Sequence, residues 1–254
     1  MIKLNIAILC VMVLSSCTKP IKELQAPVLP DLFTLDRYTL SGSVPVFRFD
    51  SLRSQVLVTV RRGGLMAKLG HDHIVSSHQL QGFIVMDRDN QRCHAEFYFP
   101  LQSMEVDNPQ LRAQARMQTT PSDKAINDTR INMLKSLEAK QFPFVQLRSE
   151  DCSGAFSNSS VMVEIQLHGV IQEREIELNW HRDATGVLTA HSAFSLLQTD
   201  FDIVPFAIMS GLIKVEDRLE VSVRLIANPL NTTKQYFCHP NLQMTADHQS
   251  QPHP

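Results

Sequence analysis

The sequence lacks any dense block of lysine or arginine, and it carries little net charge. Its 24 Lys+Arg residues nearly balance 26 Asp+Glu residues, which leaves a formal net charge of -2. Proteins that bind nucleic acid neutralise phosphates with concentrated positive charge. We therefore exclude nucleic acid as an expected partner.

Cysteine is also scarce, with five in 254 residues and no CxxC pair. Cys10 and Cys17 lie in the N-terminal segment treated below, which leaves Cys93, Cys152 and Cys238 for the folded part. Three cysteines form at most one internal disulfide, and spacing alone does not select the pair. The pattern excludes a small scaffold held together by many disulfides.

Catalytic motifs are absent as well. The chain has no nucleophile elbow, no glycine-rich phosphate loop and no zinc-protease helix. His71 and Asp72 lie near Ser76 and Ser77 in the sequence. Adjacent residues on a strand point to opposite faces, so His71 and Asp72 do not suit a catalytic dyad. We expect no enzymatic activity.

The N-terminus has the form of an export signal. Lys3 precedes an apolar run from Leu4 to Leu14, which is too short to span a bilayer. The following Leu14-Ser15-Ser16-Cys17 resembles a bacterial lipobox, so residues 1–16 are predicted to be removed and Cys17 to carry lipid. A plain secreted protein and an uncleaved anchor are the alternatives.

Lipidation would tether the chain to a membrane without spanning it. Thr18 stands where an Asp would favour inner-membrane retention, so we expect the periplasmic face of the outer membrane in a bacterial cell envelope. Residues 17–36 contain three prolines and no sustained periodicity, which is typical of a flexible tether. Residues 228–254 are polar and are predicted to form a mobile tail, leaving one domain at 37–227.

Within that domain, alternating apolar and polar residues predict strands. Residues 92–100 alternate most cleanly, with His94, Glu96 and Tyr98 on the expected solvent face. Residues 108–140 differ in composition, and Ser122 as an N-cap predicts one helical insertion. Further strands are expected at 46–49, 55–62, 80–87, 144–149, 161–169, 172–180, 188–197 and 212–227.

Eight or nine antiparallel strands with one helical insertion are best accommodated by a closed barrel, because closure removes exposed sheet edges. We predict a mainly β fold, a single antiparallel eight-stranded, lipocalin-like β-barrel, with a two-sheet sandwich as the alternative. The alternation does not distinguish a ligand tunnel from a filled core. The residues expected to face the interior are Val58, Phe97, Phe99, Val163, Ile165, Leu167, Phe194, Phe206 and Val221.

Four segments carry a family resemblance, in this order: residues 80–85 (LQGFIV), 132–149 with its Phe142-Pro143, 167–170 (LHGV) and 198–206 (QTDFDIVPF). Together they resemble the YceI-like family of exported lipid-binding barrels, over residues 38–227. The resemblance implies an apolar tunnel for a long isoprenoid or other amphiphilic lipid, which the protein carries or sequesters. It implies no other cofactor.

The chain departs from the commoner family pattern at residues 61–73, which contain Gly63, Gly64, Gly70, His71 and His73. We interpret this stretch as a glycine-hinged loop and strand start at the barrel rim. His71 and His73 are two residues apart and share a strand face, so a metal site is the alternative.

Such a metal site needs further ligands, for which the candidates are His168, His191, His94 and Asp72. A metal-binding envelope stress protein is therefore an alternative function. Another is a solid-barrel structural module whose outer surface binds a protein partner of unknown identity.

Overall fold

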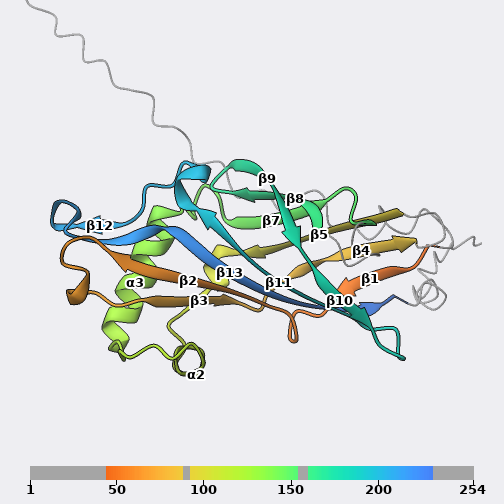
Figure 1. Cartoon of the computed structure of the whole chain (residues 1–254), viewed down its shortest axis with the longest axis horizontal. Helices are drawn as coiled ribbons and strands as arrows, with labels where there is room; N and C mark the ends of the chain where they lie inside the picture. Colours follow the sequence, from red (N-terminus) through yellow and green to blue (C-terminus); the bar gives the residue numbers. More distant parts are fainter. Residues whose placement is uncertain (1–43, 88–91, 154–159, 231–254) are drawn as a thin grey trace, which may run out of the picture.

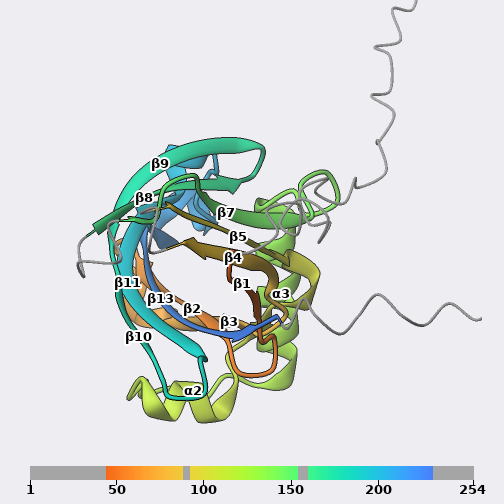
Figure 2. The same cartoon turned by 90° about the vertical axis from the view of Figure 1, so that its right-hand side faces the viewer.

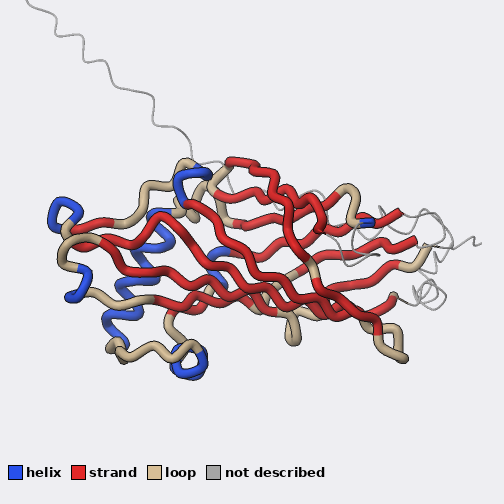
Figure 3. The backbone as a smooth tube through the Cα atoms, viewed as in Figure 1, coloured by secondary structure: helices blue, strands red, loops and turns tan. Residues whose placement is uncertain are grey.

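The computed structural model describes residues 44–87, 92–153 and 160–230 (Figure 1). This part is mainly antiparallel β-structure, as predicted, with two α-helices and several short 3-10 turns (Figure 3). The strands are β1 Val46–Phe49, β2 Gln55–Gly63, β3 His73–Ser77, β4 Gln81–Asp87, β5 Arg92–Pro100, β6 Glu105–Val106, β7 Phe144–Ser149, β8 Ser160–Leu167, β9 Val170–Glu177, β10 Asn179–Arg182, β11 Leu188–Leu197, β12 Ala207–Ile208 and β13 Ile213–Pro229.

All thirteen described strands belong to one sheet, which runs in the order β6-β3-β2-β13-β1-β4-β5-β7-β8-β9. The 17-residue β13 also pairs with β11 and β12, so it organises the sheet. Viewed along its length, the sheet curls round until β9 approaches β11 (Figure 2). Within the described part no ladder joins these two strands.

The strand count differs from the predicted eight because one expected strand is divided and the short strands β3, β6 and β12 were not foreseen. The predicted strand at residues 172–180 breaks at Leu178, which separates β9 from β10. The two-residue strands β6 and β12 are too short to show a periodic pattern. The runs at 46–49, 92–100, 144–149 and 188–197 coincide with β1, β5, β7 and β11.

The predicted solvent face of β5 is largely buried, which corrects one expectation. Glu96 is fully buried and Tyr98 is 8% exposed. The cause is the central position of β5 between β4 and β7, which places Arg148 directly opposite Glu96. Alternation predicts which residues share a face, but the neighbouring strands decide whether that face meets water.

The predicted helical insertion is two helices, α2 Pro109–Gln114 and α3 Asp123–Ser136. Asn108 caps α2 by accepting hydrogen bonds from two backbone N–H groups, and Ser122 Oγ caps α3 as predicted. Helix α3 lies across one end of the curled sheet (Figure 1). Its Ile126, Met133 and Leu137 pack against the apolar core.

Cys93 and Cys152 form a disulfide that joins β5 to the segment after β7. The backbone N–H of Cys152 also donates to the Cys93 carbonyl oxygen at 2.9 Å. The predicted signal and tether at 1–36, with Cys10 and Cys17, lie outside the described residues, as does Cys238. Strand β13 continues to Pro229, two residues past the predicted domain end at 227.

No helix in the described ranges is both long and apolar enough to cross a bilayer.

Candidate ligand cavity and histidine cluster

A cavity of about 210 Å³ lies between the curled sheet and helix α3. Its sheet walls are apolar and come from strands distant in sequence, including Val58 of β2, Phe99 of β5 and Val221 of β13. The helix contributes Met133 and Leu137. Nearly all polar lining residues lie on α3 or near the loops, namely Thr129, Asn132, Ser136, His73 and Gln198.

A second cavity of about 110 Å³ adjoins the first and shares part of its lining. Its lining is almost wholly apolar and includes Phe49, Trp180 and the Cys93–Cys152 disulfide. The side chains of Leu147, Phe194 and Val223 line both cavities. These three residues, here called the dividing residues, therefore lie where the two spaces adjoin.

Every residue that the alternation placed inside the barrel lines one of these cavities. Phe97 and Val163 line the second cavity, and Phe194 lines both. The others line the larger cavity, namely Val58, Phe99, Ile165, Leu167, Phe206 and Val221. Their contact with a ligand stays a prediction.

The β2–β3 connection lies beside the loops that flank β12. Gly64 has a φ of +89°, and a Cβ there would come within 2.4 Å of the Leu212 carbonyl oxygen. Gly64 is thus required where two backbones meet. Gly63 ends strand β2, and Gly70 has an ordinary φ of -98°, so the backbone conformation requires glycine only at Gly64. A hinge in this connection stays a prediction.

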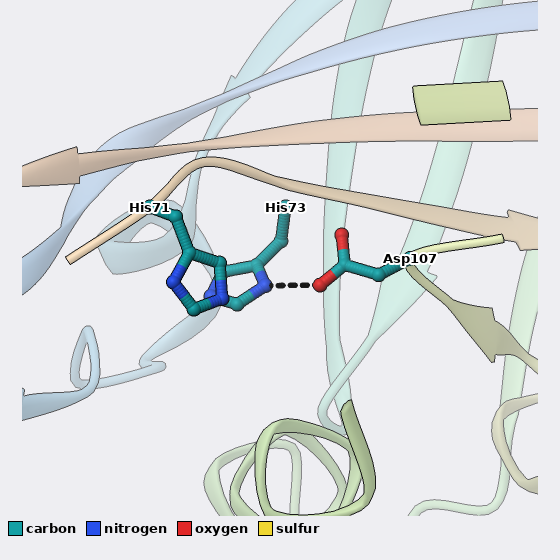
Figure 4. A group of neighbouring side chains, drawn as sticks. All are labelled: His71, His73 and Asp107. Carbon is teal, nitrogen blue, oxygen red and sulfur yellow. Dashed lines mark hydrogen bonds and ion pairs between the residues drawn. The ribbon is translucent and has the colours of Figure 1, made fainter. Parts of the chain in front are cut away.

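His71 and His73 lie at the end of this connection, where β3 begins. Their rings are 4.5 Å apart between centroids, and His73 Nδ1 donates to Asp107 Oδ2 at 2.7 Å (Figure 4). His73 pairs across from Val60 of β2 and lines the larger cavity. The predicted common face of His71 and His73 therefore places this cluster next to the candidate ligand space.

Asp107 has hydrogen-bond partners in addition to His73. The carboxylate accepts from the Ile74 backbone N–H at 3.0 Å and from Arg112 Nη1 at 2.5 Å, and its side chain is fully buried. Burial alone raises the pKa of Asp107, but the hydrogen bonds from His73, Ile74 and Arg112 outweigh it and lower that pKa. Asp107 is therefore ionised and acts only as an acceptor.

His71 has a different environment from its neighbour. Burial, followed by the positive charges around it, lowers the pKa of His71, which favours the neutral imidazole. Its Nε2 atom is shielded from solvent and meets no hydrogen-bond partner within the described chain.

Asp72 points to the other face, where Arg61 Nη1 donates to its Oδ2 at 3.1 Å. Although burial raises the pKa of Asp72, hydrogen bonds from the Arg62 backbone and the Arg61 side chain lower it overall. Asp72 is therefore engaged by Arg61 and Arg62.

Among the described residues, the group whose ligand atoms lie close enough together to hold a metal ion consists of His71, His73 and Asp107. The further ligands considered from the sequence do not join it: His168 Nδ1 bonds the Phe201 carbonyl oxygen, and His94 lies beside Glu150. His191 lies on β11. Asp107 was missed because it lies 34 residues from His73, in a turn after the two-residue strand β6.

Comparison with known proteins gives structural matches alone, because no family model and no curated protein matches the sequence. A polyisoprenoid-binding domain from Saccharophagus degradans, implicated in plant cell wall breakdown, matches with a TM-score of 0.50 and 13% identity. That match covers 72% of this chain and 98% of the domain.

Burkholderia cenocepacia BcnA matches with a TM-score of 0.49 and 12% identity, over 71% of this chain and 99% of BcnA. A YceI protein of Campylobacter jejuni gives 0.39 and 12%, over 59% of this chain and 80% of its own. At these identities the first likeness establishes the fold. The chain therefore has the fold of a polyisoprenoid-binding domain, as its resemblance to the YceI-like family predicted.

Proposed function

We propose that this protein is a membrane-tethered lipoprotein that binds one long-chain apolar or amphiphilic lipid, of isoprenoid type, inside its barrel. Binding serves to carry or sequester the lipid, without catalysis. The lipid on Cys17 holds the protein at the periplasmic face of the outer membrane.

The observation that carries this proposal is the pair of adjoining apolar cavities, of about 210 and 110 Å³. A fully packed interior leaves few voids larger than a water molecule, so spaces of this size favour a ligand over a solid core. Because both spaces run along one barrel, they suit an extended chain. The polar side chains Thr129, Asn132 and Ser136 give a polar head a place beside α3.

Exposed apolar side chains near the β2–β3 connection support exchange of lipid with a membrane. Leu65 is 92% exposed and Leu69 is 68% exposed on that connection. Ile208 at the end of β12 and Met209 just after it are also exposed. The Met66 N–H to Leu212 O hydrogen bond ties this segment to the β2–β3 connection. Exposed apolar groups gathered on neighbouring loops are typical of surfaces that meet a membrane or a partner.

The test is the lipid content of the full-length protein, purified from membranes in mild detergent. Extraction with organic solvent and mass spectrometry should release a long-chain lipid in roughly equimolar amount. Ile165→Trp fills the larger cavity and should reduce the recovered lipid several-fold. Gln166→Trp, an exposed change on the same strand, is the matched control and should leave it unchanged.

A native melting curve shows that each variant is folded, and Val58→Phe provides a smaller obstruction if Ile165→Trp does not fold. Protein that is repeatedly empty, or equal lipid in both tryptophan variants, would contradict the proposal. Cys17→Ala tests the tether separately, because it should release the chain from the membrane fraction while the domain melts as before.

A further inference from the structure

We propose that His71 and His73 bind one divalent transition-metal ion of the zinc and copper class, with Asp107 positioning His73. This site is distinct from the lipid cavity in chemistry, and it does not depend on the proposed lipid function.

The first argument is the arrangement of nitrogen atoms. Asp107 is an acceptor, so the hydrogen bond at 2.7 Å places the proton of His73 on Nδ1 and leaves a lone pair on Nε2. A carboxylate bonded to the distal nitrogen of a histidine is the usual support of a metal-ligating imidazole. Figure 4 shows the His71 ring beside this imidazole, on the side away from Asp107.

The second argument is that the His71 ring has a buried nitrogen atom without a hydrogen-bond partner. Its Nε2 atom is removed from solvent without a hydrogen-bond partner in the described chain. A buried polar atom left unpaired costs free energy, so such an atom calls for a specific partner. One potential ligand atom from each of His71, His73 and Asp107 lies within 4.8 Å of the other two, so the two imidazoles are near enough for one ion to contact both after small side-chain adjustments.

The charge of the site and the type of its ligand atoms indicate which class of metal ion it would bind. Asp107 is already neutralised by Arg112, which hydrogen-bonds its Oδ1 atom, and the histidines ligate as neutral imidazoles. The site therefore offers no net negative charge and few oxygen ligands, which disfavours Mg²⁺ and Ca²⁺. Neutral imidazole nitrogens suit Zn²⁺ and Cu²⁺. Two protein nitrogens leave coordination positions open, as in metal sites that accept an external ligand.

The experiment titrates the full-length protein, purified in detergent without a polyhistidine tag, with Zn²⁺ against a chromogenic chelator. We expect one saturable site that Mg²⁺ and Ca²⁺ in large excess do not occupy. His71→Ala and His73→Ala should each weaken it at least tenfold, and Asp107→Asn by about 10- to 100-fold. His191→Ala, an exposed change on β11, is the matched control and should have no effect.

A spectroscopic readout separates ligation from a general effect on the fold. Cu²⁺ bound to the wild-type protein should show nitrogen hyperfine coupling in its electron paramagnetic resonance spectrum, and His71→Ala should reduce that coupling. The Nε2 atom of His71 has no hydrogen-bond partner among the described residues, so this variant should keep the native melting curve. Absence of saturable Zn²⁺ binding, or equal affinity in the His71→Ala and His191→Ala variants, would overturn the proposal.

Discussion

At the scale of single residues, Arg112 and Asp107 form a buried ion pair, with Arg112 Nη1 at 2.5 Å from Asp107 Oδ1. Both side chains are almost inaccessible, so removing Arg112 leaves the buried Asp107 carboxylate without its charged partner, supported only by the hydrogen bonds from His73 and the Ile74 N–H. We expect Arg112→Ala to lower the free energy of unfolding by about 3–5 kcal/mol, measured by urea denaturation.

The exposed pair of Lys124 and Asp128 on α3 is the matched control for that substitution. Lys124→Ala should cost at most about 0.5 kcal/mol, because water and salt screen exposed charges. Similar losses in the two variants would show that burial of the Arg112 pair has no energetic role.

Asp217 provides a pH dependence of known sign. Hydrogen bonding from the Thr199 side chain lowers its pKa below the ordinary value of 3.8. The unfolded state therefore binds a proton more readily, so the stabilisation is present above the ordinary pKa and is lost as pH falls through the lowered one. Asp217→Asn should be less stable than wild type at pH 7, with a gap that narrows in acid. If the difference in unfolding free energy between wild type and Asp217→Asn stayed constant from pH 7 to pH 2, the proposed role of Asp217 ionisation would be excluded.

The sequence identifies some residues of the candidate site and not others for a physical reason. Val58, Phe97 and Ile165 follow from alternation, which is a local property of a strand. The common face of His71 and His73 follows in the same way. Asp107 depends on a contact across 34 residues and on a left-handed backbone conformation, with φ of 56°, neither of which has a local pattern.

At the scale of elements, Gly64 fixes the path of the β2–β3 connection. A side chain there meets both an unfavourable φ and the Leu212 backbone, so Gly64→Ala should lower stability by about 1–3 kcal/mol. Gly70→Ala is the matched change on the same connection, and the nearest atom to its Cβ would lie at 3.6 Å. Equal melting temperatures of the Gly64→Ala and Gly70→Ala variants would contradict the claim that glycine is required at Gly64.

The longer elements were predictable because they carry several repeats of their own period, as β11 and the Ser122-capped α3 show. The sequence did not predict the break between β9 and β10, nor the gap between the two helices. These interruptions are set by the elements against which the chain packs, so propensity alone does not locate them.

At the scale of the whole molecule, the sheet order depends on pairings that only the folded chain defines. Strand β1 pairs with the end of β13, so that Phe49 lies opposite Ala227. The choice of Cys93 and Cys152 as a disulfide likewise follows from the proximity of β5 to the segment after β7. The barrel class was predictable from the number of alternating runs, whereas this connectivity was not.

The dividing residues Leu147, Phe194 and Val223 bear on the speed of ligand entry. We expect a chain that fills the first cavity to push these side chains aside before it reaches the second, because they line both spaces. Uptake of a fluorescent polyisoprenoid by delipidated protein should therefore proceed in two phases, with the slower phase set by side-chain rearrangement. Phe194→Ala should merge them into one, and a single phase in the wild type would argue against a barrier here. We would then expect the dissociation rate to depend on chain length. A short lipid would exchange quickly, and a long lipid that extends past Phe194 would be released slowly.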